Sequence, residues 1–123
     1  MHMHFLCKKE RDMIDFHCHV LMGIDDGSRN LKTSVSMLEA SKTQGVQQIV
    51  CTPHFDATKD RMEEFLINRD YAFQVLQKWI DASDAVDIRL YPAAEVFFLG
   101  LHFFLGDGFF ARGIDRNLIR VKK

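Results

Sequence analysis

Histidine and carboxylate side chains recur at three places where an apolar stretch of the chain gives way to polar residues. His17 and His19 follow the first apolar stretch, His54 follows the second, and Glu95 follows the third. Imidazole nitrogens together with carboxylate oxygens form a ligand set that suits zinc, manganese or iron. The recurrence therefore indicates a site for divalent metal ions.

The first of these places has a spacing that favours a shared metal centre. His17 and His19 are separated by Cys18 alone, and alternate residues of an extended chain point to the same side. Both imidazoles are therefore predicted to face one centre, with the thiol turned away. The Asp-Asp-Gly sequence at residues 25–27 follows in the next loop. By itself it is an ordinary turn signature, and it supports a metal site only in combination with the nearby histidines.

Other interpretations of these residues have to be weighed. A single histidine at the end of a strand is more often a surface or hydrogen-bonded residue than a ligand, but three such places in succession favour a metal site. Cys51 could suggest a thiolate nucleophile. A cysteine-dependent phosphatase would need an arginine six residues later, where this sequence has Ala57. Cys51 is therefore predicted to be a buried strand cysteine.

The first half of the chain predicts a strand, a loop and a helix. A strand begins at Met13 and leads through the histidines into a polar loop that ends near Asn30. Apolar residues then recur at helical spacing from Leu31. Ser28 or Asn30 can serve as N-cap of this helix, and Gly45 can end it.

The remaining elements predict an α/β fold. β-Branched residues over 46–52 predict a second strand, and residues 60–83 predict a helix with Asp60 and Glu63 as a capping box. Residues 86–94 predict a third strand. The β-α-β-α-β order implies a parallel sheet. Ligands of such sheets collect at the carboxyl ends of the strands.

Composition limits the domain organisation and the partners. The chain has 123 residues and a formal net charge of −1, which allows one domain but not a complete eight-stranded βα barrel of roughly 200 residues or more. No basic stripe is present, so nucleic acid is not an expected partner. Three cysteines without a C-x-x-C pair favour a cytoplasmic setting. The longest apolar stretches fall short of a membrane span, so the protein is not expected to be embedded in a membrane.

Taken together, the motifs resemble a known family. The sequence MIDFHCHVLMGIDDG at residues 13–27 is followed by Thr-Pro-His at residues 52–54 and by Ala-Glu at residues 94–95. This combination is similar to the N-terminal part of the bacterial PHP-type protein-tyrosine phosphatases, manganese-dependent enzymes of capsule and exopolysaccharide operons. The resemblance covers about residues 13–98. The H-x-H pair together with the I-D-D-G loop points to this branch of the PHP proteins.

The resemblance carries expectations about the site and the fold. It implies that His17 and His19 bind one metal ion, that Glu95 bridges two, and that Asp26 and His54 contribute to a neighbouring one. The ions would be manganese, with zinc or iron as alternatives, and would activate a hydroxide that attacks phosphorus. The fold would be a parallel βαβαβ portion of a distorted seven-stranded βα barrel, and therefore incomplete.

The resemblance also implies a domain plan and a substrate. Residues 1–12 would be an N-terminal extension, and residues 13–123 the N-terminal part of one PHP domain in which residues 99–123 diverge. The substrate would be phosphotyrosine on a tyrosine kinase of polysaccharide export. The resemblance also implies further metal ligands, later histidines and an Asp-x-His, from strands beyond the third. Because this sequence shows no such ligands after residue 98, we expect weak or no hydrolysis by this chain alone.

Three alternatives remain open. The chain could be a non-catalytic remnant, or an assembly module whose open sheet edge and C-terminal phenylalanines pair with another chain. The sequence leaves open whether such pairing produces an oligomer. The chain could also belong to another PHP phosphoesterase, such as a histidinol-phosphate phosphatase.

Overall fold

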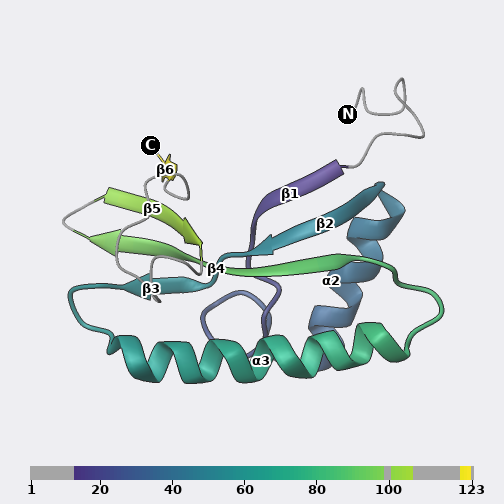
Figure 1. Cartoon of the computed structure of the whole chain (residues 1–123), viewed down its shortest axis with the longest axis horizontal. Coiled ribbons are helices and arrows are strands. Elements are labelled where there is room, and N and C mark those ends of the chain that lie inside the picture. Colours follow the sequence, from purple (N-terminus) through teal and green to yellow (C-terminus); the bar gives the residue numbers. More distant parts are fainter. Residues whose placement is uncertain (1–12, 99–100, 107–119, 123) are drawn as a thin grey trace.

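A mixed β-sheet with two helices on one side forms the described part of the chain (Figure 1). The computed structural model describes residues 13–98 and the backbone of residues 101–106 and 120–122. In chain order the elements are β1 (Met13–Cys18), α2 (Leu31–Thr43), β2 (Val46–Cys51), β3 (His54–Asp56), α3 (Met62–Ala82), β4 (Arg89–Phe98), β5 (Leu101–Gly106) and β6 (Arg120–Lys122).

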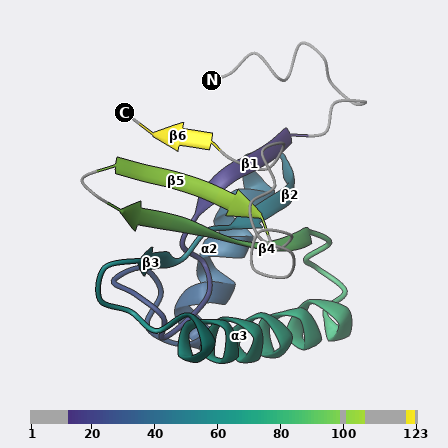
Figure 2. The ribbon, with the colours of Figure 1, turned by 60° about the vertical axis from the view of Figure 1, so that its left-hand side comes forward.

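The sheet is parallel in its first half and antiparallel in its second. The strand order is β1-β2-β4-β5-β6, and β3 pairs with β4 as well. Strands β1, β2 and β4 run parallel, as do β3 and β4, whereas β5 is antiparallel to β4 and β6 is antiparallel to β5. Figure 2 shows β5 beside β4, and β6 on the far side of β5. The predicted α/β fold with a parallel sheet is confirmed, with an antiparallel extension that the sequence did not predict.

The third predicted strand differs from the observed one at both ends. Strand β4 spans Arg89–Phe98, so the prediction of residues 86–94 begins too early and ends too soon. Val86 and Ile88 are buried before the strand begins. The strand continues past residue 94 because β3 pairs with it on one edge and β5 on the other. Glu95 therefore lies inside a strand and not after it.

The two helices begin differently. Asn30 caps α2, since its side-chain oxygen accepts the Thr33 backbone N–H at 2.9 Å, and of the two predicted candidates Asn30 is the cap. Gly45 follows the helix with a φ of +94°, a conformation that glycine adopts readily. The capping box predicted for the second helix is wrong. Arg61 is the N-cap of α3, and Asp60 instead accepts the Asp56 backbone N–H at 2.8 Å.

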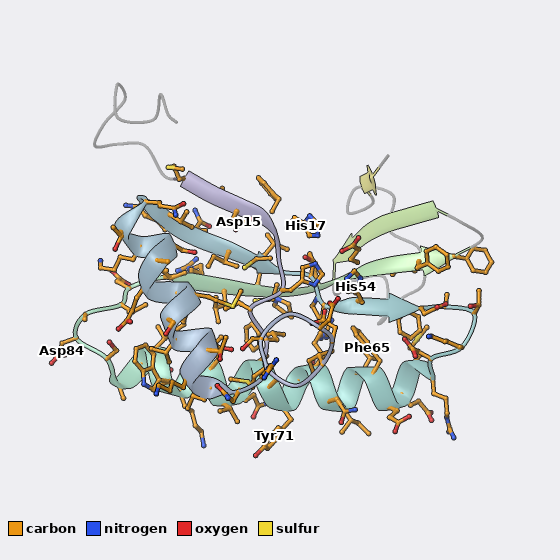
Figure 3. The ribbon with its side chains drawn as sticks, turned by 180° about the vertical axis from the view of Figure 1, so that it is seen from behind. Asp15, His17, His54, Phe65, Tyr71 and Asp84 are labelled. Carbon is orange, nitrogen blue, oxygen red and sulfur yellow. The ribbon has the colours of Figure 1, made fainter. Side chains whose placement is uncertain are left out.

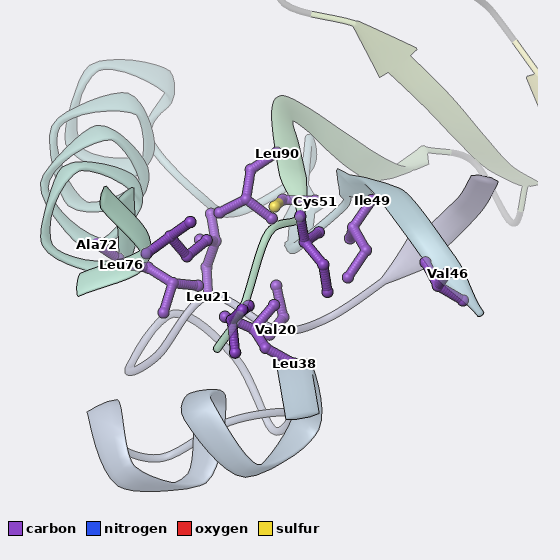
Figure 4. Packing of buried hydrophobic residues seen from close by; sticks show 12 residues of the cluster. Val20, Leu21, Leu38, Val46, Ile49, Cys51, Ala72, Leu76 and Leu90 are labelled. Carbon is purple, nitrogen blue, oxygen red and sulfur yellow. The ribbon is translucent and has the colours of Figure 1, made fainter. Parts of the chain in front are cut away.

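The hydrophobic core lies between the sheet and the helices. Leu38 of α2, Ile49 of β2 and Leu76 of α3 have no exposed surface, and Figure 4 shows them with their neighbours. Burying each such side chain stabilises the fold by about 1.5–3 kcal/mol. A second cluster joins Phe55 of β3 to Phe65 of α3. It supports the end of the sheet at which the candidate ligands lie.

The opposite face of the sheet carries exposed apolar side chains. Ile14, Phe16 and Tyr91 are 40%, 50% and 38% exposed. They alternate along β1 and β4 with residues that face the helices. The Tyr91 hydroxyl donates to the Gln48 side chain at 2.8 Å, linking β4 to β2 across this face. The helices therefore cover one side of the sheet only.

Two parts of the predicted domain plan concern the chain ends. The predicted extension at residues 1–12 lies outside the described residues, and so do the side chains of the divergent segment at residues 99–123. The backbone of that segment contributes β5 and β6. Within residues 13–98, neither helix has the length and apolar character that a membrane crossing requires.

Candidate metal centre

The predicted ligands meet where β1 ends, β3 begins and β4 passes between its partners. His17 lies near the end of β1, and His19 follows that strand directly. His54 is the first residue of β3 and pairs in register with Glu95 of β4. Figure 3 shows His17 and His54 at this junction. Parallel pairing of β3 with β4 thus brings side chains from distant parts of the sequence together.

A local irregularity in β1 helps to present the first two histidines. The pairing of β1 with β2 shifts register between Asp15 and Cys18. Asp15 Oδ1 accepts the backbone N–H of His17 at 3.0 Å, which stabilises the shifted backbone. The predicted alternation is confirmed, since the Nε2 atoms of His17 and His19 lie 3.0 Å apart. Cys18 packs against the core, as expected.

Glu95 is the centre of the cluster. Its Oε1 atom lies 2.9 Å from His17 Nε2, 3.1 Å from His19 Nε2 and 3.6 Å from His54 Nδ1. The Glu95 side chain is only 1% exposed. Burial of a carboxylate is costly unless cations or hydrogen-bond donors surround it. The convergence of imidazoles on one buried oxygen is therefore the main chemical feature of the site.

The spacing of the donor atoms fits a metal ion. Ligand atoms about 2.1 Å from one ion in tetrahedral geometry lie about 3.4 Å apart. His17, His19 and Glu95 offer one ligand atom each, all within 4.8 Å of one another. His19, Asp25 and His54 form a second such group. The donors are imidazoles and carboxylates, as manganese, zinc and iron accept.

Asp26, the fifth predicted ligand, lies at the rim of the cluster. Its side chain is 91% exposed, and its Oδ1 atom is 3.9 Å from His54 Nε2. It belongs to neither of the two groups described above. The structure therefore brings His17, His19, His54 and Glu95 together, with Asp26 next to His54 on the outer side.

The neighbouring Asp25 is the residue that the sequence analysis missed as a member of the site. Its Oδ2 atom lies 2.9 Å from His19 Nδ1 and accepts the backbone N–H of His54 at 2.9 Å. The duplicated aspartate of the Asp-Asp-Gly turn was the available signal. Sequence alone does not reveal which of the two carboxylates turns inward.

The pKa values of this pair shift in opposite directions. The hydrogen bond to the Asp25 carboxylate raises the pKa of His19, and this outweighs burial, which lowers it. Burial alone would raise the pKa of Asp25, but hydrogen bonds from His19 and from the backbone N–H groups of His54 and Gly27 hold it below its ordinary value. Asp25 therefore remains a carboxylate at neutral pH.

Gly27 allows the loop to approach the end of β1. A Cβ atom at this position would lie 2.5 Å from the His19 carbonyl oxygen and 2.6 Å from His19 Cβ. Both distances are far inside van der Waals contact. We expect Gly27→Ala to displace the loop and destabilise the protein by about 1–3 kcal/mol, as overpacking does, measured by thermal denaturation. Gly23→Ala is the comparison: an added Cβ atom there has nothing within 4 Å, so its cost reflects the strain of a φ of +74° and not overpacking.

The two described cysteines are not activated nucleophiles. Burial raises the pKa of Cys18 to about 12, with the Asp15 carboxylate adding to the effect. Burial also raises the pKa of Cys51 far above its ordinary value, and Cys51 has no exposed surface. The prediction that Cys51 is a buried strand cysteine is confirmed. Neither of these two thiols therefore supplies a thiolate nucleophile beside the histidine–carboxylate cluster.

An open cavity lies beside His54. Its volume is about 140 Å³. Its apolar walls are Ile24 and Phe65, and the polar groups around it come from the loop after β3 and the first turns of α3, namely Asp60, Arg61, Glu64 and Asn68. The cavity is therefore positioned to receive a group attached to whatever binds at the cluster.

These features define a class of protein in which a parallel α/β sheet holds a histidine–carboxylate cluster at its strand junctions. A family model described as "Capsular polysaccharide synthesis, CpsB/CapC" matches residues 13–101. The chain therefore belongs to the CpsB/CapC family, and the resemblance found from the motifs is confirmed.

Individual relatives are named as tyrosine-protein phosphatases. The chain is 31% identical over 95 residues to YwqE of Bacillus subtilis, a match that covers 68% of this chain and 35% of the relative. It is 34% identical over 79 residues to CpsB of Streptococcus pneumoniae, covering 59% and 32%. A shorter match to CpsB of Streptococcus agalactiae is 48% identical over 42 residues, covering 34% and 17%.

A solved structure agrees with these matches. It comes from a study of YwqE from Bacillus subtilis and CpsB from Streptococcus pneumoniae, described as unique metal-dependent tyrosine phosphatases. The TM-score is 0.53 at 28% sequence identity, and the match covers 72% of this chain and 34% of the other. The α/β fold is therefore shared with that structure. The chain spans about a third of the length of these relatives, so the fold that it holds is incomplete, as predicted.

Proposed function

We propose that this chain supplies metal ligands to a phosphatase that hydrolyses phosphotyrosine on proteins. The ligands are His17, His19, Asp26, His54 and Glu95. The observation that carries the proposal is the convergence of three imidazoles on the buried Glu95 oxygen. Membership of the CpsB/CapC family supports the reaction class, because the relatives are named as tyrosine-protein phosphatases.

The residues divide the work of the site between them. Bound divalent ions, manganese first and zinc or iron as alternatives, would neutralise phosphoryl charge and lower the pKa of a bound water. Glu95 is central, so its carboxylate can be shared between neighbouring ion positions. His17 and His19 hold one side of the centre. His54 holds the other, with Asp26 beside it.

The cavity beside His54 supports an aryl phosphate as substrate. The cavity opens to solvent beside His54, and its volume of about 140 Å³ leaves room for one aromatic ring. A phosphoryl group held at the cluster would leave the attached phenolic ring next to Ile24 and Phe65. As protein substrate we propose a bacterial tyrosine kinase of polysaccharide export, with the cytoplasm as the location of the reaction.

An assembly role is the second candidate, and one observation favours it. The sheet face opposite the helices exposes Ile14, Phe16 and Tyr91, while the chain spans about a third of its relatives. In this assembly role the chain would bind metal ions but would release no phosphate until further protein covers that face. The phosphatase role and the assembly role therefore predict the same metal content but different rates of substrate hydrolysis.

Metal analysis and turnover on the purified chain test the proposal. We expect manganese to bind in stoichiometric amounts by elemental analysis, and we expect weak phosphate release that is faster from a phosphotyrosine peptide than from histidinol phosphate. The double variant H17A/H19A should lose both properties. Stoichiometric manganese in the double variant would reject the site. Metal binding without turnover would favour the assembly role, and preferred hydrolysis of histidinol phosphate would indicate the other PHP activity.

A further inference from the structure

Asp25 joins three segments of the site through a single carboxylate. Oδ2 accepts from the His19 ring at Nδ1 and from the backbone N–H of His54, both at 2.9 Å. Oδ1 accepts the backbone N–H of Gly27 at 2.9 Å. The end of β1, the following loop and the start of β3 are thus held together by one side chain, which is 6% exposed.

These contacts distinguish Asp25 from its neighbour Asp26. Oδ2 accepts two hydrogen bonds from the protein, so an ion bound at that oxygen would have to displace the bond from His19 or the bond from His54. Asp26, by contrast, is 91% exposed beside His54. The two adjacent aspartates therefore have different surroundings, and Asp25, the inner one, accepts hydrogen bonds from protein donors.

The hydrogen bond to His19 fixes where the proton of that ring sits. Both ring nitrogens face carboxylate oxygens: Nδ1 lies 2.9 Å from Asp25 Oδ2, and Nε2 lies 3.1 Å from Glu95 Oε1. A carboxylate only accepts hydrogen bonds, and the shorter contact to Asp25 favours the neutral tautomer with its proton on Nδ1. The lone pair is then on Nε2, which lies 3.1 Å from Glu95 Oε1 and faces the cluster. Metal-binding histidines commonly donate their second ring N–H to a carboxylate in this way.

We propose that Asp25 is a positioning residue that sets the tautomer and orientation of His19 and anchors the backbone of His54. Through these two residues it determines how tightly the centre holds metal ions. The proposal rests on the proposed function for its effect on metal affinity. Its effect on His19 can be measured without any metal.

The variant Asp25→Asn tests both effects. We expect the dissociation constant for Mn²⁺, measured by calorimetric titration, to rise 10- to 100-fold, the usual cost of losing such a partner. In the metal-free protein at a pH where His19 is neutral, ¹⁵N NMR should show the Nδ1–H tautomer for the wild type and a mixture of tautomers for the variant. Asp84→Asn, on the exposed loop before β4 (Figure 3), should change neither reading.

The outcomes are distinguishable from failure of the proposed function. A wild-type chain that binds no Mn²⁺ would reject the metal centre, while the tautomer measurement would still test the contact. An Nε2–H tautomer of His19 in the wild type would overturn the proposal even if Asp25→Asn failed to fold. A variant with unchanged tautomer and Mn²⁺ affinity within about twofold of the wild type would overturn it as well.

Discussion

Glu95→Gln is expected to lower the affinity of the chain for Mn²⁺ by at least about 100-fold. Loss of a residue that only hydrogen-bonds to a metal ligand already lowers metal affinity 10- to 100-fold. Glu95 is expected to matter more, because its carboxylate is the group on which three imidazoles converge. The amide has nearly the same shape but no negative charge to balance an ion. Calorimetric titration of the metal-free protein with Mn²⁺ measures the loss.

A matched control separates the effect of losing the Glu95 charge at the site from the effect of losing one negative charge elsewhere on the protein. Glu39 lies exposed on α2, and Glu39→Gln removes the same charge without touching the cluster. The fold of Glu95→Gln should persist, because the metal-free protein no longer has to bury a carboxylate, and circular dichroism can check this. Equal Mn²⁺ affinity of Glu95→Gln and wild type would mean that the ion does not bind at this carboxylate.

The sequence predicted the histidine pair well because its geometry depends on local structure. An extended backbone places alternate residues on one side whatever surrounds it, so the H-x-H spacing was enough to bring His17 and His19 together. The parallel order of β1, β2 and β4 followed from the alternation of strands and helices in the same way. Both predictions needed only neighbouring residues.

The features that the sequence missed depend on distant partners. Strand β3 has three residues, too few for a hydrophobic period, and it exists through its pairing with β4. That pairing is also what puts His54 opposite Glu95. The choice between Asp25 and Asp26 is decided by which carboxylate reaches the backbone N–H of His54. Such contacts appear only once the strands are in place.

Arg69 shows how a non-local contact lets a charged side chain lie in the core. It lies on the buried face of α3, and its side chain is only 2% exposed although it carries a charge. The guanidinium donates to the Asp70 carboxylate at 2.8 Å and to the Ala93 carbonyl at 3.3 Å. Ala93 precedes Glu95 by two residues on β4. Arg69 therefore links α3 to the strand that carries the central carboxylate.

Arg69→Ala is accordingly expected to destabilise the fold by about 3 kcal/mol. The loss combines a cavity left by the long side chain with the removal of a hydrogen bond to a buried carbonyl. For a domain of this size the melting temperature should fall by roughly 12 °C or more, measured by circular dichroism on the metal-free protein. Lys78→Ala, at an exposed position of the same helix, should change it little.

A second variant separates the two causes. Arg69→Met keeps most of the aliphatic volume but none of the donors, so recovery of most of the lost stability would assign the effect to packing. If Arg69→Met is as unstable as Arg69→Ala, the lost stability comes from the guanidinium hydrogen bonds to Ala93 and Asp70. A melting temperature of Arg69→Ala close to that of Lys78→Ala would contradict the prediction. It would mean that the buried Arg69 side chain adds little to the packing of α3 against β4.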